Sequence, residues 1–293
     1  MNLYIAIIIQ MLFIKANTNS PSLTISRSKA HEDKSGDATP LVVSLSTEDK
    51  EEKVKSVDLI CIVDVSYSMI GDPLDLVKES LKYLVKLMND TDNFALVTFS
   101  GSSKIVNNLT RMTEENKSMI LDNIEKLKVM DNTNIYSGLE KGLQLLKNDY
   151  SSGDRIASMI LLSDGEDNYY RKNVVSKFEK LMVSEGKKDF TFTLYTFGYG
   201  SHFDSELMNN IALIKDGNYI NIDKLSDVND AFLKIYGSLS TVSNVNVQLK
   251  IQSNFKIIKV YGIEDMHEAN MTSDTFNVKL IQVVYGRKYN FIL

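Results

Sequence analysis

Residues that build rigid or covalently braced folds are scarce in this chain of 293 residues. It contains one cysteine, three prolines and no tryptophan. A single cysteine cannot form an internal disulfide, so the fold does not depend on an oxidising compartment, although it does not exclude one. Because Cys61 lies inside an apolar run, we expect it to behave as a small buried hydrophobic residue.

An excess of positive charge is also missing. The formal net charge is −5 and the charged residues are spread along the chain. Without a basic patch, neither nucleic acid nor an anionic lipid surface is expected as a partner. What is present is an ordinary apolar fraction of 43%, enough for a real core, and a length that permits one medium domain with extra material, or two domains.

The N-terminal segment, residues 1–16, is hydrophobic and has two interpretations. Residues 3–14 are almost wholly apolar, about as long as the core of a signal peptide and too short for a transmembrane helix. If the segment is a cleaved signal peptide, the protein is secreted or extracytoplasmic. If it is instead a hydrophobic strand or anchor that stays attached, a cytoplasmic protein is expected, and contact with a membrane is expected only in this second case.

Three further regions follow. Residues 17–56 form a polar linker and a β segment, in which Leu41, Val43 and Leu45 alternate as in a half-buried strand. Residues 57–240 alternate apolar strands with amphipathic helices, which predicts an α/β domain with a doubly wound, mostly parallel, Rossmann-like sheet between helices. Residues 241–293 alternate with period two, which predicts antiparallel strands that the 41–46 segment joins in a small second sheet; whether this segment is complete stays open.

Oxygen-bearing side chains follow the ends of these strands. The first strand ends in Asp64-Val-Ser66-Tyr-Ser68, a later one leads into Asp164, and the loop before a helix contains Thr133. Ligands of open parallel sheets bind beyond the carboxyl ends of the strands, so these side chains are expected to converge. An all-oxygen set favours Mg²⁺, with Mn²⁺ and Ca²⁺ as alternatives, whereas Zn²⁺ would be expected to recruit His or Cys.

The five positions resemble a known metal site. Asp64-x-Ser66-x-Ser68, Thr133 within D-N-T-N-I and Asp164 within L-L-S-D-G-E-D are similar to the metal-ion-dependent adhesion site of von Willebrand factor type A (VWA) domains, and the resemblance covers about residues 57–240. It implies that Ser66 and Ser68 coordinate the metal directly, that Thr133 does so directly or through water, and that both aspartates act mainly through water. It further implies a vacant position for an acidic side chain of a partner protein.

Other polar and aromatic residues receive simpler interpretations. Tyr67 stands where the family often has glycine: if the backbone there needs a positive φ the side chain would be strained, and otherwise it projects as an aromatic anchor for a partner. Asp131, Glu166 and Asp167 are interpreted as solvated loop charges. The histidines His202 and His267 have no partner at ligand spacing, so neither is expected to bind metal.

The expected function is divalent-cation-dependent protein binding, in adhesion or complex assembly, and not catalysis. A Mg²⁺ hydrolase of the phosphatase type would need an acid where Ser66 stands, and neither a G-x-x-x-x-G-K-[ST] loop nor an H-E-x-x-H helix occurs. A scaffold subunit remains an alternative, because a type A domain with β-rich sequence resembles inter-α-trypsin inhibitor heavy chains and intracellular proteins linked to ubiquitin ligation. No RING cysteines are present, so ligase activity is not expected.

Three properties stay open. The family's affinity switch moves the last helix, here residues 227–239, but nothing in this segment indicates two conformations. The identity of the partner and the oligomeric state are not encoded in any pattern of this sequence.

Overall fold

The structure, a computed structural model, forms two compact units: residues 55–240, and residues 1–54 together with 241–293. It describes residues 7–15, 22–27, 41–46, 55–146, 155–164, 167–170, 173–186, 190, 192–199, 204–215, 217–240, 242–253, 268–272, 275–284 and 288–292.

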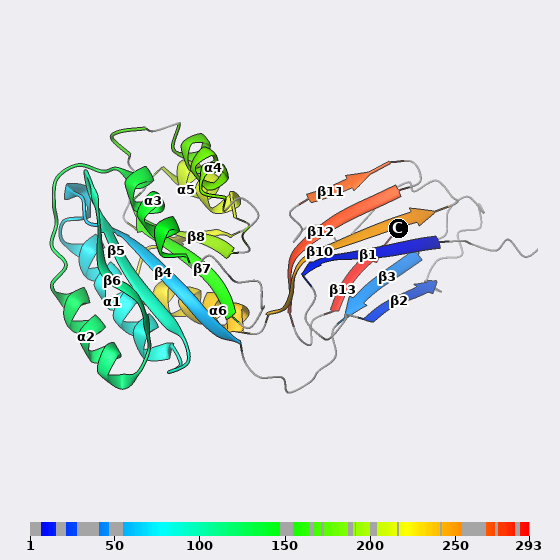
Figure 1. Cartoon of the computed structure of the whole chain (residues 1–293), viewed down its shortest axis with the longest axis horizontal. Helices are drawn as coiled ribbons and strands as arrows, with labels where there is room; N and C mark the ends of the chain where they lie inside the picture. The colour runs from blue at the N-terminus through cyan, green and yellow to red at the C-terminus, as the bar shows by residue number, and fades with distance from the viewer. Residues whose placement is uncertain are drawn as a thin grey trace, which may run out of the picture. The chain divides into compact units, whose positions relative to one another are not determined.

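The 55–240 unit is built on a six-stranded sheet (Figure 1). Its strands are parallel except β6, which pairs antiparallel with β5 at one edge. The spatial order is β6 (Ser103–Arg111), β5 (Asn93–Phe99), β4 (Ser56–Asp64), β7 (Arg155–Ser163), β8 (Phe192–Tyr199) and β9 (Tyr219–Ile222).

Helices cover both faces of this sheet (Figure 1). Apolar side chains of α3, α4 and α5 form one cluster with the β4, β5 and β7 residues that point to their side. On the other face, Phe232 of α6 packs on Phe197 of β8, with ring centroids 4.7 Å apart, and Tyr199 Oη donates to Ser80 Oγ of α1 at 3.2 Å. The helices are α1 (Asp72–Leu87), α2 (Glu114–Glu125), α3 (Ile135–Leu145), α4 (Val174–Ser184), α5 (Ser205–Leu213) and α6 (Leu225–Ser240).

Two glycines let α3 lie close to the sheet. A Cβ at Gly142 would lie 2.5 Å from Ile62 Cδ1, and one at Gly138 would lie 2.7 Å from Phe99 Cδ1. Interiors are packed too densely to absorb such overlaps without movement. The glycines therefore set the position of α3, and with it the loop that precedes the helix and contains Thr133.

The β-rich unit contains two antiparallel sheets (Figure 1). Phe276 of the first sheet and Phe291 of the second are both buried, with ring centroids 6.1 Å apart, so the two sheets share a core. The first has the order β1 (Ile7–Lys15), β10 (Val242–Ser253), β12 (Thr275–Val284) and β11 (Glu268–Met271), and the second has the order β13 (Lys288–Ile292), β3 (Leu41–Ser46) and β2 (Ser22–Arg27).

The predicted fold class is confirmed: helices flank a mostly parallel sheet, and the 41–46 strand pairs with C-terminal β13. One strand differs from expectation. Strand β3 is more buried than predicted, because Ser44 donates to Asn290 Oδ1 at 2.7 Å and lies in the interior. Cys61 is buried as expected, and burial raises the pKa of its thiol.

The N-terminal apolar run contains strand β1, which pairs with β10. Within the residues that the structure describes, no helix combines the length and the apolar character needed to cross a bilayer. Signal peptide and cellular location both stay predictions.

Candidate metal centre

Asp64, the last residue of β4, is the most buried carboxylate at the carboxyl end of the sheet. Its Oδ1 accepts a hydrogen bond from the Ser66 backbone N–H at 2.8 Å, and its Oδ2 accepts one from Ser163 Oγ at 2.6 Å. Because Ser163 ends the neighbouring strand β7, the two hydrogen bonds hold the carboxylate between two strand ends.

The two predicted serine ligands lie next to each other. Ser66 Oγ and Ser68 Oγ are 3.0 Å apart, on a short turn that continues into the 3-10 helix η1 (Tyr67–Met69). Ser66 is buried and Ser68 is exposed, so this pair of hydroxyls extends from the Asp64 carboxylate to the surface. The parallel strand end and the tight turn after it bring the D-x-S-x-S residues together.

Thr133 reaches the same place from another loop. Its backbone N–H donates to Asn168 Oδ1 at 2.9 Å, and its carbonyl accepts from the Asn168 N–H at 2.9 Å. The Met130 N–H also donates to the Val65 carbonyl at 2.6 Å, which ties this loop to the one after β4. A hollow of about 440 Å³ is lined by Tyr67, Ser68, Asp131, Asn132, Thr133 and Asn168.

Electrostatics mark Asp64 as an unusual carboxyl. Burial is the largest effect and, together with the nearby charge of Asp164, raises the pKa of Asp64 to about 7, against the opposing effect of its hydrogen bonds from Ser163 and Ser66. Asp164 is itself buried. Among the described residues, the groups that shift this pKa include no cation. Asp64 is thus buried beside a second carboxyl, and the described groups that stabilise its own charge are hydroxyl and amide donors.

Asp167 corrects one prediction. It was expected to be a solvated loop charge, yet only 6% of it is exposed. Its carboxylate accepts from the Ile135 N–H at 2.9 Å and from the Tyr170 N–H at 2.5 Å, so it caps the first turn of α3 and closes its own loop. Asp131 is exposed, as predicted, whereas Glu166, His202 and His267 lie outside the described residues.

Sequence reasoning did not assign Ser163 or Asn168 to the site, and it gave Asp167 a different role. Ser163 had a usable signal, since it ends a predicted strand directly before Asp164. Asp167 and Asn168 had none, because their side chains turn back to backbone groups of the Thr133 loop, about 35 residues away in sequence.

The backbone around the hollow is strained at one residue only, within the described ranges. Asn132 has a φ of 60°, and it is the only residue other than glycine with a positive φ. Asparagine tolerates this conformation better than most residues. Tyr67 does not adopt it, so the predicted alternative of a strained tyrosine is wrong; its side chain is 65% exposed.

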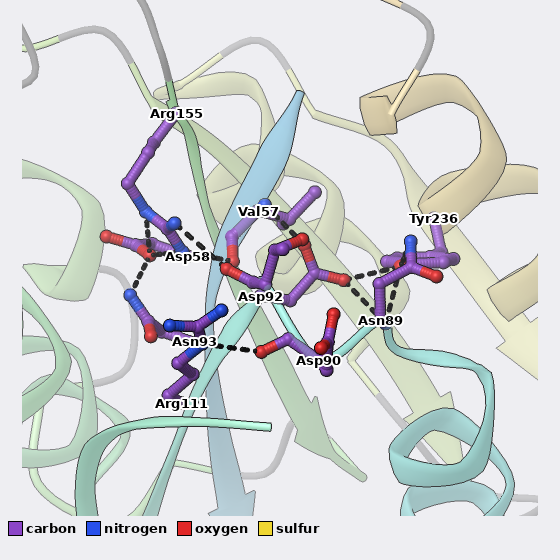
Figure 2. Close-up of polar contacts among 10 residues, drawn as sticks. Val57, Asp58, Asn89, Asp90, Asp92, Asn93, Arg111, Arg155 and Tyr236 are labelled. Atoms are coloured by element: carbon purple, nitrogen blue, oxygen red, sulfur yellow. Dashed lines mark hydrogen bonds and ion pairs between the residues drawn. The ribbon is translucent and has the colours of Figure 1, made fainter. Parts of the chain in front are cut away.

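The opposite end of the sheet carries a second polar network (Figure 2). Asp58, near the start of β4, is fully buried and forms an ion pair with Arg155, whose Nε lies 2.7 Å from its Oδ1. Asp92 accepts from the Val57 N–H at 2.7 Å and from Tyr236 Oη at 2.5 Å. These aspartates tie the amino-terminal ends of β4, β5 and β7 to one another and to Tyr236 in the last part of α6.

Comparison with known proteins identifies the class. The family model for the von Willebrand factor type A domain matches residues 58–234, more than half of the chain, and the chain belongs to this family. Uncharacterized protein YfbK of Escherichia coli (strain K12) is 34% identical over 188 residues, which are 62% of this chain and 31% of that protein. Human inter-alpha-trypsin inhibitor heavy chain H3 is 27% identical over 188 residues, 62% of this chain and 20% of that one.

The chain thus spans well under two thirds of these relatives. Among solved structures, a von Willebrand factor type A protein from Catenulispora acidiphila has a TM-score of 0.66 at 14% identity, covering 99% of this chain and 64% of that chain. Proximal thread matrix protein 1 from the mussel byssus, with zinc in its metal-ion-dependent adhesion site (MIDAS) motif, has a TM-score of 0.50 at 23% identity. The match covers 62% of this chain and 46% of that chain. At these identities the likeness shows the fold alone.

Proposed function

We propose that the VWA domain of this chain is a protein-binding module that holds a divalent cation at the carboxyl end of its sheet and binds a carboxylate of its partner. The observation that carries the proposal is the burial of Asp64 beside Asp164, with no cation among the described groups that shift the pKa of Asp64. Burying a carboxylate without a compensating charge costs several kcal/mol. A bound cation would remove this cost.

The residues present fit such a cation. Ser66, Ser68 and Thr133 offer hydroxyl oxygens, while Asp64 and Asp164 offer negative charge close behind them. Within the described part of the chain, no group of three or more His, Cys, Asp or Glu side chains is arranged to hold a metal, so an ion here would depend on the hydroxyls. This donor set suits Mg²⁺ or Mn²⁺, and Ca²⁺ with more waters. The cation would supply an electrophile that attracts a partner's carboxylate.

Domains of this family mediate protein–protein interactions, some of them through a metal ion. We extend that function to this chain, and we propose that it does not act as an enzyme. The site supports this view because Ser66, at the position where a phosphatase-like mechanism would require an acid, is engaged with Ser68. A Mg²⁺-dependent turnover in a broad hydrolase screen would contradict it.

The test is calorimetric titration of the full chain with MgCl₂ after chelation and dialysis. The wild type should bind one Mg²⁺, and both Asp64→Ala and Ser68→Ala should abolish binding while circular dichroism shows the fold retained. Asp122→Ala, which removes an exposed carboxylate on α2, is the matched control and should bind normally. The same titration with MnCl₂, CaCl₂ and ZnCl₂ defines the preferred ion. Normal Mg²⁺ affinity in the two site variants would refute the proposal.

A further inference from the structure

Exposed apolar side chains gather on the loops that carry the candidate ligands. Among the described residues, four of the ten exposed large apolar side chains lie on three loops at the carboxyl end of the sheet. We call these four the apolar rim: Tyr67 and Ile70 after β4, Met130 before α3, and Tyr169 after β7. Apolar patches of this kind on soluble proteins commonly mark binding sites.

Hydrogen bonds fix the backbone of the rim. The Ile70 N–H donates to the Tyr67 carbonyl at 3.1 Å, and the Met130 N–H donates to Val65. Tyr169 stands between Asn168, whose backbone N–H donates to the Thr133 carbonyl, and Tyr170, whose N–H donates to the Asp167 carboxylate. The Tyr169 hydroxyl lies over Gly101, 3.2 Å from where a Cβ of that residue would be. Because the backbone that carries these side chains is already fixed, binding would cost ordering of the side chains alone.

The hollow inside the rim is polar and carries its own negative charge. Ser68, Thr133 and Asn168 line it, and so does the exposed Asp131. With a cation bound at the hydroxyls, one incoming carboxylate is attracted. A second carboxylate beside the first would face Asp131 and be repelled. Apolar side chains at that position of the partner would instead pack against the apolar rim.

We infer that the domain selects, in its partner, a single Asp or Glu flanked within two residues by aromatic or aliphatic side chains, and that it discriminates against acidic tracts. The inference rests on the proposed function and adds the partner's local sequence to it. An extended segment advances about 3.3 Å per residue, so neighbours one and two positions from the acid reach side chains around the hollow. Buried aromatic contacts of this kind supply much of the energy of small interfaces.

The experiment measures binding of three fluorescent peptides to the full chain in MgCl₂ and in chelator. All three have one central Asp. It is flanked on both sides by Phe and Leu in the first, by Ser in the second and by Glu in the third. The apolar-flanked peptide should bind at least ~10-fold more tightly than the other two, and only with Mg²⁺ present.

The variants Tyr67→Ser and Tyr169→Ser should each weaken this peptide ~10-fold without changing Mg²⁺ affinity. Val183→Ser, which removes an exposed apolar side chain near the end of α4, is the matched control and should change neither. Equal affinities for the apolar-flanked and Ser-flanked peptides, preference for the Glu-flanked one, or undiminished binding by both tyrosine variants would overturn the inference. If the wild-type chain does not bind Mg²⁺ at all, the proposed function itself would be refuted.

Discussion

Strand β4 carries a buried aspartate near each end, and the two are compensated differently. Asp58 forms an ion pair with Arg155 and also accepts from Asn93 Nδ2 at 2.6 Å (Figure 2). Asp64, six positions later on the same strand, accepts only from neutral donors among the described residues and lies near a second carboxylate. The protein supplies the counter-charge at the amino-terminal end, and at the carboxyl end we propose that it comes from solution.

This difference separates structural from binding roles. A buried charge that forms an ion pair within the same chain is already compensated. Its effect on the stability of the fold therefore does not depend on divalent cations in solution. A buried charge without such a partner makes the local stability depend on whatever binds there. Divalent cations should therefore stabilise the carboxyl end of β4 and leave the amino-terminal end unaffected, which makes the comparison testable.

The largest effect is expected from Arg155→Met, which leaves Asp58 buried without its cation. Removing one member of a buried pair typically costs roughly 3 kcal/mol or more. Chemical denaturation should show this loss equally in MgCl₂ and in chelator. Arg111→Met, which alters an exposed arginine bonded to the Asp90 carbonyl, is the control and should change little. Rescue of Arg155→Met by Mg²⁺ would break the comparison.

The next effect concerns how the carboxyl end is assembled. Gly142→Ala should displace α3 from Ile62 and lower the free energy of unfolding by ~1–3 kcal/mol. Since Thr133 precedes this helix, Mg²⁺ affinity should fall as well. The control is Gly237→Ala in α6, where a Cβ meets no atom within 4 Å, and this variant should be neutral or slightly stabilised. Equal stabilities of the two variants would contradict the packing argument.

Asp64→Asn should stabilise the metal-free protein at pH 8, because the amide carries no charge to bury. The pKa of Asp64 in the folded chain, about 7, lies above its ordinary value of 3.8. The folded state therefore binds the extra proton between these values, and the stability of the metal-free wild type falls as the pH rises from about 4 to 7 and stays low above it.

The asparagine should flatten that dependence and also abolish stabilisation by Mg²⁺. Thermal melts in chelator and in MgCl₂, from pH 5 to 8, measure both effects. A variant that melts below the wild type in chelator at pH 8 would show that the charge of Asp64 is not a cost.

The smallest effect is expected from Ser163→Ala, which removes the hydroxyl bond that orients Asp64. Residues that orient metal ligands commonly change affinity ~10-fold or more, and we expect a ~10-fold loss of Mg²⁺ affinity by calorimetry. Ser158→Ala removes another buried serine of β7, bonded to the Thr193 carbonyl, and serves as the control with unchanged affinity. Similar affinities in both variants would argue against the orienting role.

Periodicity predicted most of the fold because each element buries a face. The apolar run that contains Cys61 lies within β4, and the alternating residues Leu41, Val43 and Leu45 lie in β3. The D-x-S-x-S turn was also predictable, because its members are adjacent in sequence. The Asp58–Arg155 pair was not, because it depends on the register in which Ser56 of β4 faces Arg155 of β7.

Asp167 shows the limit for loops. A loop aspartate that faces water and one that turns inward to accept from backbone N–H groups have the same local sequence. Only the approach of the Ile135 N–H decides between them, and that approach depends on where α3 packs. Tyr67 shows the opposite outcome. It is unusual for the family at this position, but its backbone φ is not positive, so the side chain causes no backbone strain.

The most direct test of a cation at the carboxyl end of β4 is anomalous diffraction from crystals of the full chain grown in MnCl₂. The account predicts a strong manganese peak in coordination contact with the hydroxyl oxygens of Ser66 and Ser68, and none beside Asp58. Crystals saturated with Mn²⁺ that show no peak between these hydroxyls and Thr133 would contradict it.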